Sequence, residues 1–198
     1  LFDVPLDYNL YEASDSHGNY DLPRIFENTL VKEMPNLAVT FVDNHDTEPG
    51  QALCSWVQDW FKPLAYALIL LRKDGLPCVF YGDYYGIAFQ KINPKKEMLE
   101  KMLNLRKQYA YGGQIDYFDH HNIIAWVRTG DDEHPGSGLV AIMSDGPGGG
   151  KTINVGQKLA NTLFYDYTGN IQETVYVDKD GNGIFYCNGG SVSVWVKK

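Results

Sequence analysis

The segment Phe41-Val42-Asp43-Asn44-His45-Asp46 is the best candidate for chemistry, because it sets an imidazole beside a carboxylate just after an apolar run. Residues 37–42 are apolar apart from Thr40, which is typical of a parallel strand covered on both faces. In a βα barrel, active sites are built where such strands end. A carboxylate held there can meet positive charge, and an imidazole N–H can donate a hydrogen bond. Asp and Asn are also common turn residues, so the local pattern leaves a plain loop equally open.

The first part of the chain alternates short apolar runs with helical spacing, which predicts parallel βα units. We expect strands at 2–6, 37–42 and 78–81, and helices at 22–30, 57–69 and 98–109. A closed eightfold barrel takes about 250 residues, so three such units cannot close one. The rest of the barrel is therefore expected upstream of Leu1.

From about Tyr111 the apolar period changes to two, which predicts an antiparallel β-sandwich or barrel. Gly, Asp and Asn clusters separate the runs, and we expect strands at 123–127, 139–143, 152–155, 175–177, 184–187 and 192–196. The domain boundary is therefore predicted near residue 110.

Composition narrows the range of partners. The formal charge of −8 and the sequence pI of about 5.0 exclude nucleic acid and anionic membranes as expected partners. The longest apolar run, residues 64–71, is far shorter than the roughly 20 residues of a bilayer-spanning helix. Cys54, Cys78 and Cys187 are widely spaced and predict neither a disulfide framework nor a zinc site. Free thiols favour a reducing compartment, with secretion left open.

The segment around His45 and Asp46 resembles the fourth signature region of the α-amylase family, glycoside hydrolase family 13. The whole chain is similar to the liquefying bacterial α-amylases. The other matching segments are Leu1-Phe2-Asp3-Val4-Pro5-Leu6, Trp60-Phe61-Lys62-Pro63-Leu64-Ala65-Tyr66-Ala67, Val79-Phe80-Tyr81-Gly82-Asp83, Tyr117-Phe118-Asp119-His120-His121 and Asn188-Gly189-Gly190-Ser191-Val192-Ser193. The resemblance implies the last three βα units of a (β/α)8 TIM barrel at 1–110. An antiparallel Greek-key β-sandwich domain is implied at 111–198.

The resemblance also implies an activity, the retaining hydrolysis of internal α-1,4-glucosidic bonds in starch, glycogen and maltooligosaccharides. Asp46 matches the carboxylate that stabilises the transition state, and His45 matches the neighbouring sugar-binding histidine. The family's nucleophile and general acid lie on earlier strands. We therefore expect this chain alone to be inactive, with an α-glucan as substrate and the missing N-terminal part of the same enzyme as partner.

Liquefying α-amylases share a calcium site between barrel and C-terminal domain, and the resemblance carries it onto five residues: the backbone oxygens of Gly18 and Tyr20, with His121, Asn122 and Asp145. Calcium prefers six to eight oxygen ligands. The family commonly has Asp where this chain has Asn122, and losing that charge should weaken the site. The alternative is an ordinary interdomain contact.

A second class of function is a noncatalytic carbohydrate-binding fragment built mainly on the β part. Aromatic residues make up 14% of the chain, and their faces stack well on sugar rings. Such a module would not carry three βα units with His45 and Asp46 at a strand end, so the organisation favours the enzyme.

Overall fold

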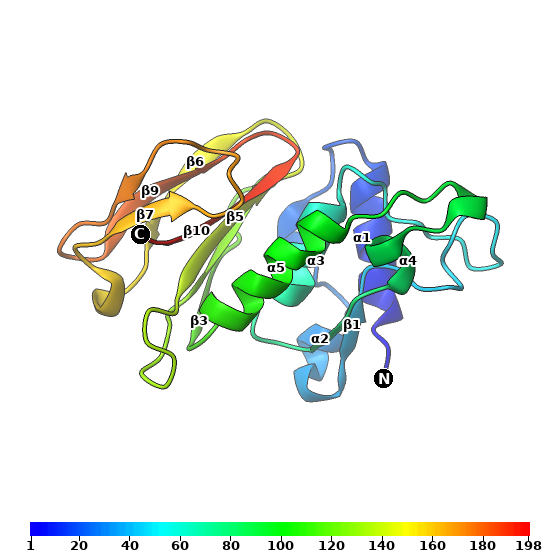
Figure 1. Ribbon diagram of the computed structural model, residues 1–198, viewed down its shortest axis with the longest axis horizontal. Coiled ribbons are helices and arrows are strands. Elements are labelled where there is room, and N and C mark those ends of the chain that lie inside the picture. The colour runs from blue at the N-terminus through cyan, green and yellow to red at the C-terminus, as the bar shows by residue number, and fades with distance from the viewer.

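The computed structural model describes residues 1–198 as a helical part followed by two antiparallel sheets (Figure 1). The helices are α1 (Val4–Asp15), α2 (Leu30–Glu33), α3 (Lys62–Leu70), α4 (Tyr81–Tyr85) and α5 (Lys96–Tyr109). Short 3-10 turns lie at Leu22–Arg24, Pro35–Leu37, Ala88–Gln90 and Gln157–Leu159. None of the helices has the length and apolar character needed to cross a membrane.

Three segments of the helical part run parallel to one another. Strand β1 (Val39–Phe41) pairs with β2 (Leu76–Cys78), and a single parallel bridge joins Phe2 to Val39 on the other side of β1. Strand β1 is therefore the middle one of the three, and the loop that follows it carries the candidate residues.

The β part contains a six-stranded sheet in the order β3-β4-β5-β10-β7-β8 and a two-stranded sheet, β6-β9. The strands are β3 (Gln114–Tyr117), β4 (Ile123–Arg128), β5 (Leu139–Ser144), β6 (Gly149–Asn154), β7 (Leu163–Asp166), β8 (Val175–Tyr176), β9 (Asn182–Cys187) and β10 (Ser191–Lys197). All pairings within these sheets are antiparallel. The prediction of an antiparallel β part is therefore confirmed, although the sequence pattern did not reveal β3 and β7.

The six-stranded sheet is covered on both faces. Alternate residues of β4, such as Ile124 and Trp126, belong to the core shared with the helices, whereas Ala125 and Val127 belong to the core shared with β6 and β9. Figure 1 shows α5 and α3 beside one face of this sheet and β6 and β9 on the other. This double burial explains why β5 is apolar at nearly every position.

The strand predicted at 2–6 is wrong beyond Phe2, because α1 already begins at Val4. Asp3 caps the helix by accepting a hydrogen bond from Leu6 N at 3.2 Å, and Pro5 occupies the first turn, where a missing N–H costs nothing. Asp3, two residues before Pro5, therefore marks the start of a helix.

The helix predicted at 22–30 is also wrong. It is replaced by the 3-10 turn Leu22–Arg24, and Asn28 has a left-handed backbone conformation with a φ of 56°. Asp21 makes no side-chain cap, and Thr29 instead caps the short α2 through Lys32 N.

The helix predicted at 57–69 begins only at Lys62, and the strand predicted at 78–81 lies earlier, at Leu76–Cys78. The helix predicted at 98–109 is confirmed as α5.

Candidate active site

His45 and Asp46 lie in the turn that follows β1, at its carboxyl end. Asn44 shapes this turn, because its side-chain oxygen accepts hydrogen bonds from Asp46 N at 2.7 Å and Thr47 N at 3.2 Å. The side chains of His45 and Asp46 are 82% and 57% exposed, with His45 Nε2 3.5 Å from Asp46 Oδ1. The turn thus presents an imidazole and a carboxylate together to solvent.

A buried charge cluster anchors the turn. Asp43 precedes it, and both of its oxygens are engaged, Oδ1 by Thr47 Oγ1 at 3.0 Å and Oδ2 by the Lys62 ammonium. Lys62 Nζ also contacts Asp83 Oδ2 at 2.9 Å, and Tyr66 donates its hydroxyl to that same oxygen at 2.6 Å. The side chains of Asp43, Lys62 and Asp83 are fully buried. Helix α3 therefore ties the loop after β1 to the residues that follow β2.

Burial sets the electrostatics of this cluster. Removal from water raises the pKa of Asp43 to about 7, although the Lys62 ammonium opposes the rise. Burial likewise raises the pKa of Asp7 to about 7, opposed by a hydrogen bond from Ser55 and by the charge of Lys62. One ammonium thus serves several carboxyl groups, which disfavours their simultaneous ionisation.

The residues predicted to hold calcium lie at the junction of the helical part and the six-stranded sheet. Three of them meet: Asn122 Nδ2 donates to Gly18 O and to Asp145 Oδ1, both at 2.9 Å. The carbonyl of His121 accepts a hydrogen bond from Leu22 N at 2.8 Å. Burial raises the pKa of Asp145, with the Asn122 hydrogen bond and the Tyr20 backbone acting against the rise.

The three groups that meet, on Gly18, Asn122 and Asp145, do not fit a cation in the arrangement observed. An amide N–H group, not an oxygen, faces the two oxygens that a metal would use. The chain also has no group of three or more His, Cys, Asp or Glu side chains placed to hold a metal ion. Whether calcium binds stays a prediction.

Comparison with known proteins identifies the family. Residues 148–196 match the family model described as Alpha-amylase C-terminal. Over 198 residues the chain is 58% identical to an α-amylase of Geobacillus stearothermophilus, covering 100% of this chain and 36% of that protein. It is 56% identical over 198 residues to a glucan 1,4-alpha-maltohexaosidase of Bacillus sp. strain 707, covering 100% of this chain and 38% of that protein. Residues 148–196 thus match the C-terminal domain of α-amylases, and the whole chain is similar to bacterial α-amylases.

A solved α-amylase supports the same fold at low identity. The structure of the Geobacillus thermoleovorans enzyme matches 98% of this chain with a TM-score of 0.68 and 16% identity, and 47% of that structure is covered. The chain spans little more than a third of the length of the two relatives above. The similarity therefore covers only part of each of these enzymes.

Lys62 is the principal residue of this candidate site that the sequence pattern did not reveal. It lies inside a quoted family segment, and Asp43 and Asp83 lie in two others, yet the pairs span 19 and 21 residues. The signal available was a lysine in an otherwise apolar helix, because Lys62–Leu70 is buried at nearly every position.

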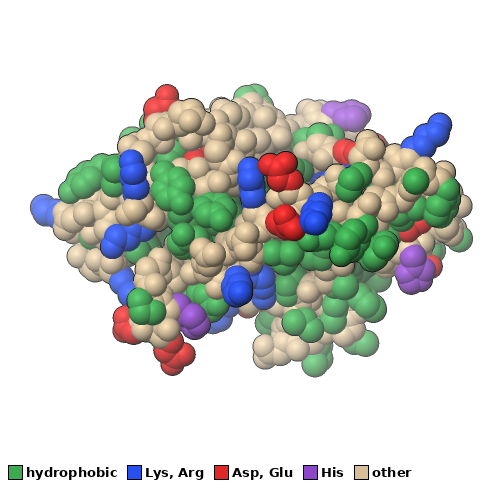
Figure 2. Space-filling view, in the orientation of Figure 1, with side chains coloured by type: hydrophobic (Ala, Val, Ile, Leu, Met, Phe, Trp, Pro, Cys, Tyr) green, Lys and Arg blue, Asp and Glu red, His purple; other side chains and the backbone are tan.

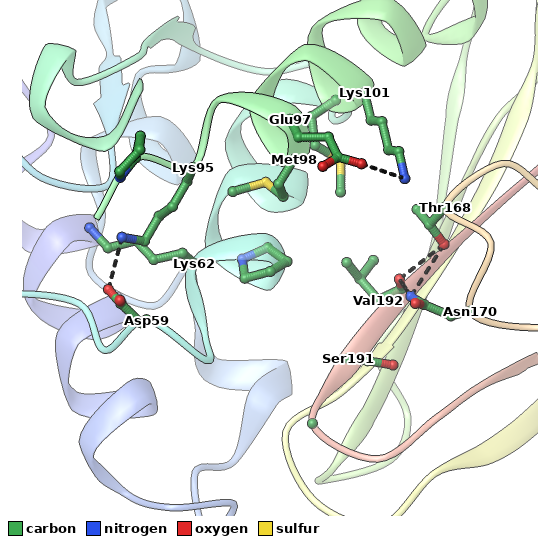
Figure 3. Close-up of a pocket in the computed structure, with 14 residues that line it drawn as sticks. Asp59, Lys62, Lys95, Glu97, Met98, Lys101, Thr168, Asn170, Ser191 and Val192 are labelled. Carbon is green, nitrogen blue, oxygen red and sulfur yellow. Dashed lines mark hydrogen bonds and ion pairs between the residues drawn. The ribbon is translucent and has the colours of Figure 1, made fainter. Parts of the chain in front are cut away.

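A pocket of about 460 Å³ lies between the start of α5 and the turn before β10. Figure 3 shows Lys62 and Lys95 side by side at one end, where Lys95 Nζ pairs with Asp59 Oδ1 at 2.9 Å. None of the predicted site residues lines this pocket, and its charged groups are already paired.

Proposed function

We propose that this chain is the C-terminal part of an endo-acting α-amylase that hydrolyses internal α-1,4-glucosidic bonds in starch, glycogen and maltooligosaccharides with retention of configuration. Asp46 is the carboxylate that stabilises the transition state, and His45 donates a hydrogen bond to the sugar. The observation that carries the proposal is the exposed His45–Asp46 pair at the end of β1, on a turn anchored by Lys62.

The physical reason is the charge of the transition state. Glycoside hydrolysis passes through an oxocarbenium-like species, with a nucleophile and a general acid on opposite sides of the bond. A further fixed anion lowers the energy of that cation, provided the anion is held in place before reaction. The Asn44 hydrogen bonds and the buried Asp43 hold the Asp46 backbone in this way.

We further propose that residues 1–110 are part of a (β/α)8 barrel and residues 111–198 a Greek-key β domain. The parallel order of Phe2, β1 and β2, with α3 between β1 and β2 in the chain, supports the barrel. The continuous core between helices and sheet supports a fixed position of one domain against the other.

The remaining part of the enzyme is the proposed partner. Large apolar side chains are exposed across the helical part: Leu1, Phe2, Met34, Leu37, Leu76, Tyr81, Tyr85 and Phe89, with Phe89 86% exposed. Figure 2 shows hydrophobic side chains gathered on the right-hand, helical half of the molecule. An exposed apolar surface of this kind is typical of an interface.

Asp46→Asn in the complete enzyme tests the proposal. The amide keeps the shape but loses the charge, so kcat should fall on the order of a hundredfold or more. The melting temperature should stay nearly unchanged, since Asp46 is exposed. The matched control is Asp132→Asn, a fully exposed carboxylate in the β part, which should leave kcat unchanged. Near-normal turnover of Asp46→Asn would remove Asp46 from the site.

The 198-residue chain by itself should release no reducing sugar from starch, because the nucleophile and general acid are proposed to lie elsewhere. Adding the separately produced N-terminal part should restore hydrolysis. Starch pull-down by this chain, with no activity after that addition, would instead favour the carbohydrate-binding alternative.

A further inference from the structure

We propose that the Asn122 amide takes the place of the metal ion that the family resemblance implies, so that a hydrogen-bonded bridge joins the helical part to the β part without calcium. The bridge consists of Gly18, Asn122 and Asp145. It links the loop after α1, the residue before β4 and the residue after β5, across 104 and 23 positions of the chain.

The geometry of the amide carries the proposal. Nδ2 has two hydrogens, and it lies 2.9 Å from both Gly18 O and Asp145 Oδ1, the usual length of an N–H···O hydrogen bond. A calcium ion would bind such oxygens at about 2.3–2.6 Å. An ion bound to both would meet the partial positive charge of the amide hydrogens. The NH₂ group therefore does with two hydrogen bonds what a shared cation would do with two metal bonds.

The backbone around the bridge is tightly fitted. A Cβ added at Gly18, whose φ is +89°, would lie 2.8 Å from Asp145 O, and one added at Gly146 would lie 2.9 Å from Asn122 Nδ2. Asn122 and Asp145 are only 8% and 4% exposed. Asp145 N also donates to Asn122 O at 3.3 Å. The segments therefore pack directly on the amide.

The small number of negative ligands agrees with this arrangement. Asp145 is the only carboxylate among the five predicted ligands, and the His121 carbonyl already serves Leu22 N. A neutral amide adds no charge to this single carboxylate, whereas calcium binds strongly only where several negative ligands surround it. Asp145 Oδ2 is buried without a protein partner. It is the atom that a cation would still use, and the experiment must therefore measure calcium directly.

The test compares the unchanged chain with Asn122→Asp and Asn122→Ala in calcium and in chelator. The unchanged chain should show the same melting temperature in both, and calorimetric titration with calcium chloride should give no binding heat. Asn122→Asp should be less stable in chelator, because two buried carboxylates repel. Calcium should restore its stability and should give a measurable binding heat, because the second carboxylate adds a negative ligand.

Asn122→Ala removes both hydrogen bonds, so it should lower the melting temperature equally with and without calcium. Asn104→Asp, on the exposed face of α5, adds the same charge elsewhere and should change neither stability nor calcium binding. In nitrogen–proton spectra, both side-chain protons of Asn122 should exchange slowly and stay unmoved by calcium.

Stoichiometric calcium binding by the unchanged chain, with a raised melting temperature and loss of the ion in Asn122→Ala, would overturn the proposal. The amide would then coordinate through its oxygen. The measurements on the unchanged chain decide this even where a variant does not fold. They involve no starch hydrolysis, so their result is independent of the role proposed for Asp46.

Discussion

Lys62 is the residue on which the candidate site depends. Its ammonium is fully buried between Asp43 and Asp83 and lies 3.6 Å from the ring centre of Trp56. A buried ion pair adds little net stability over a well-packed apolar pair, but breaking one is costly, because a charge then stays buried without a partner. The cluster therefore fixes the geometry of the loop that holds Asp46.

Replacing Lys62 by Met should lower the free energy of unfolding by about 3–5 kcal/mol at neutral pH. The loss should be smaller at pH 5, because burial raises the pKa of Asp43 to about 7 and the orphaned Asp43 carboxyl then keeps its proton in the folded state. Urea unfolding at both pH values measures this. The control is Lys101→Met, whose half-exposed side chain pairs only with Glu97 on α5, with an expected change within about 0.5 kcal/mol. Equal losses at both pH values would contradict the interpretation.

Asp7 should impose a pH dependence on folding. Its pKa of about 7 in the folded chain lies above the ordinary 3.8, so the folded state holds the proton more tightly than the unfolded state. Its contribution is fully present below pH 3.8 and is lost as the pH rises toward about 7. Asp7→Asn keeps an acceptor for Ser55 and carries no charge.

The stability of Asp7→Asn relative to the unchanged chain should therefore rise between pH 4 and pH 7, at about 1.4 kcal/mol for each pKa unit at most, and then level off. Chemical unfolding across this range measures the difference. Asp15→Asn, an exposed carboxylate at the end of α1, should leave the difference flat. A flat difference for Asp7→Asn as well would show that the Asp7 pKa is not raised.

Single residues show how far the sequence could be interpreted. His45 and Asp46 were predicted to lie at a strand end, and they do, because apolar runs followed by polar turn residues are a local signal. Their catalytic role stays a prediction. Lys62 could not be assigned, because Asp43 and Asp83, 19 and 21 residues away in the chain, meet it only in the folded structure. Ion pairs between residues so far apart in the chain leave no recognisable pattern in the sequence.

At the scale of elements, Asp3 organises two helices at once. Its Oδ1 accepts from Leu6 N at 3.2 Å and Leu30 N at 3.0 Å, and its Oδ2 accepts from Val31 N at 2.7 Å. The side chain is completely buried. One carboxylate thus satisfies free N–H groups at the starts of α1 and α2, although Leu30 lies 27 residues from Asp3 in the chain.

Asp3→Ala should therefore cost more than an ordinary helix cap, on the order of 2–4 kcal/mol, because three buried N–H groups lose their acceptor. Thermal unfolding followed by circular dichroism measures the loss. Asp3→Asn should recover only part of it, since one of its two terminal atoms is a donor. Thr29→Ala, which removes only the acceptor of Lys32 N at the start of α2, should cost about 1 kcal/mol. A similar cost for Asp3→Ala would contradict the double role.

Elements with a strong period were predicted well, whereas short elements were not. Helix α5 and the strands of the β part other than β3 and β7 follow regular apolar spacing, and they lie close to their predicted positions. The region 57–61 has helical apolar spacing without a helix, because Val57 and Phe61 are buried by the tertiary packing of a loop. Apolar spacing reports burial, and only over a long segment does it also report the conformation.

At the scale of the molecule, the six-stranded sheet joins two cores, but the helical part is covered on one side only. Its inner side packs against β4, β5 and β10, while β2 is exposed at Leu76 and Cys78 and pairs with β1 alone. Strand edges and apolar side chains that are open in this way favour association. The proposed companion for this surface is the rest of the enzyme.

Leu76→Lys should distinguish a free surface from an interface. Leu76 is 67% exposed, so in this chain alone the change should leave the melting temperature nearly unaltered and should reduce self-association, since a charge blocks edge pairing. In the complete enzyme the same lysine would be buried against the neighbouring part of the barrel, and unfolding should become easier by about 2 kcal/mol or more. Sedimentation of the chain and thermal unfolding of the enzyme measure the two effects.

Tyr176→Lys, at a similarly exposed position on β8, should change neither, because the β part is proposed to have no partner there. An unaltered melting temperature of the enzyme carrying Leu76→Lys would mean that this face of the helical part stays open to solvent, against the proposed barrel.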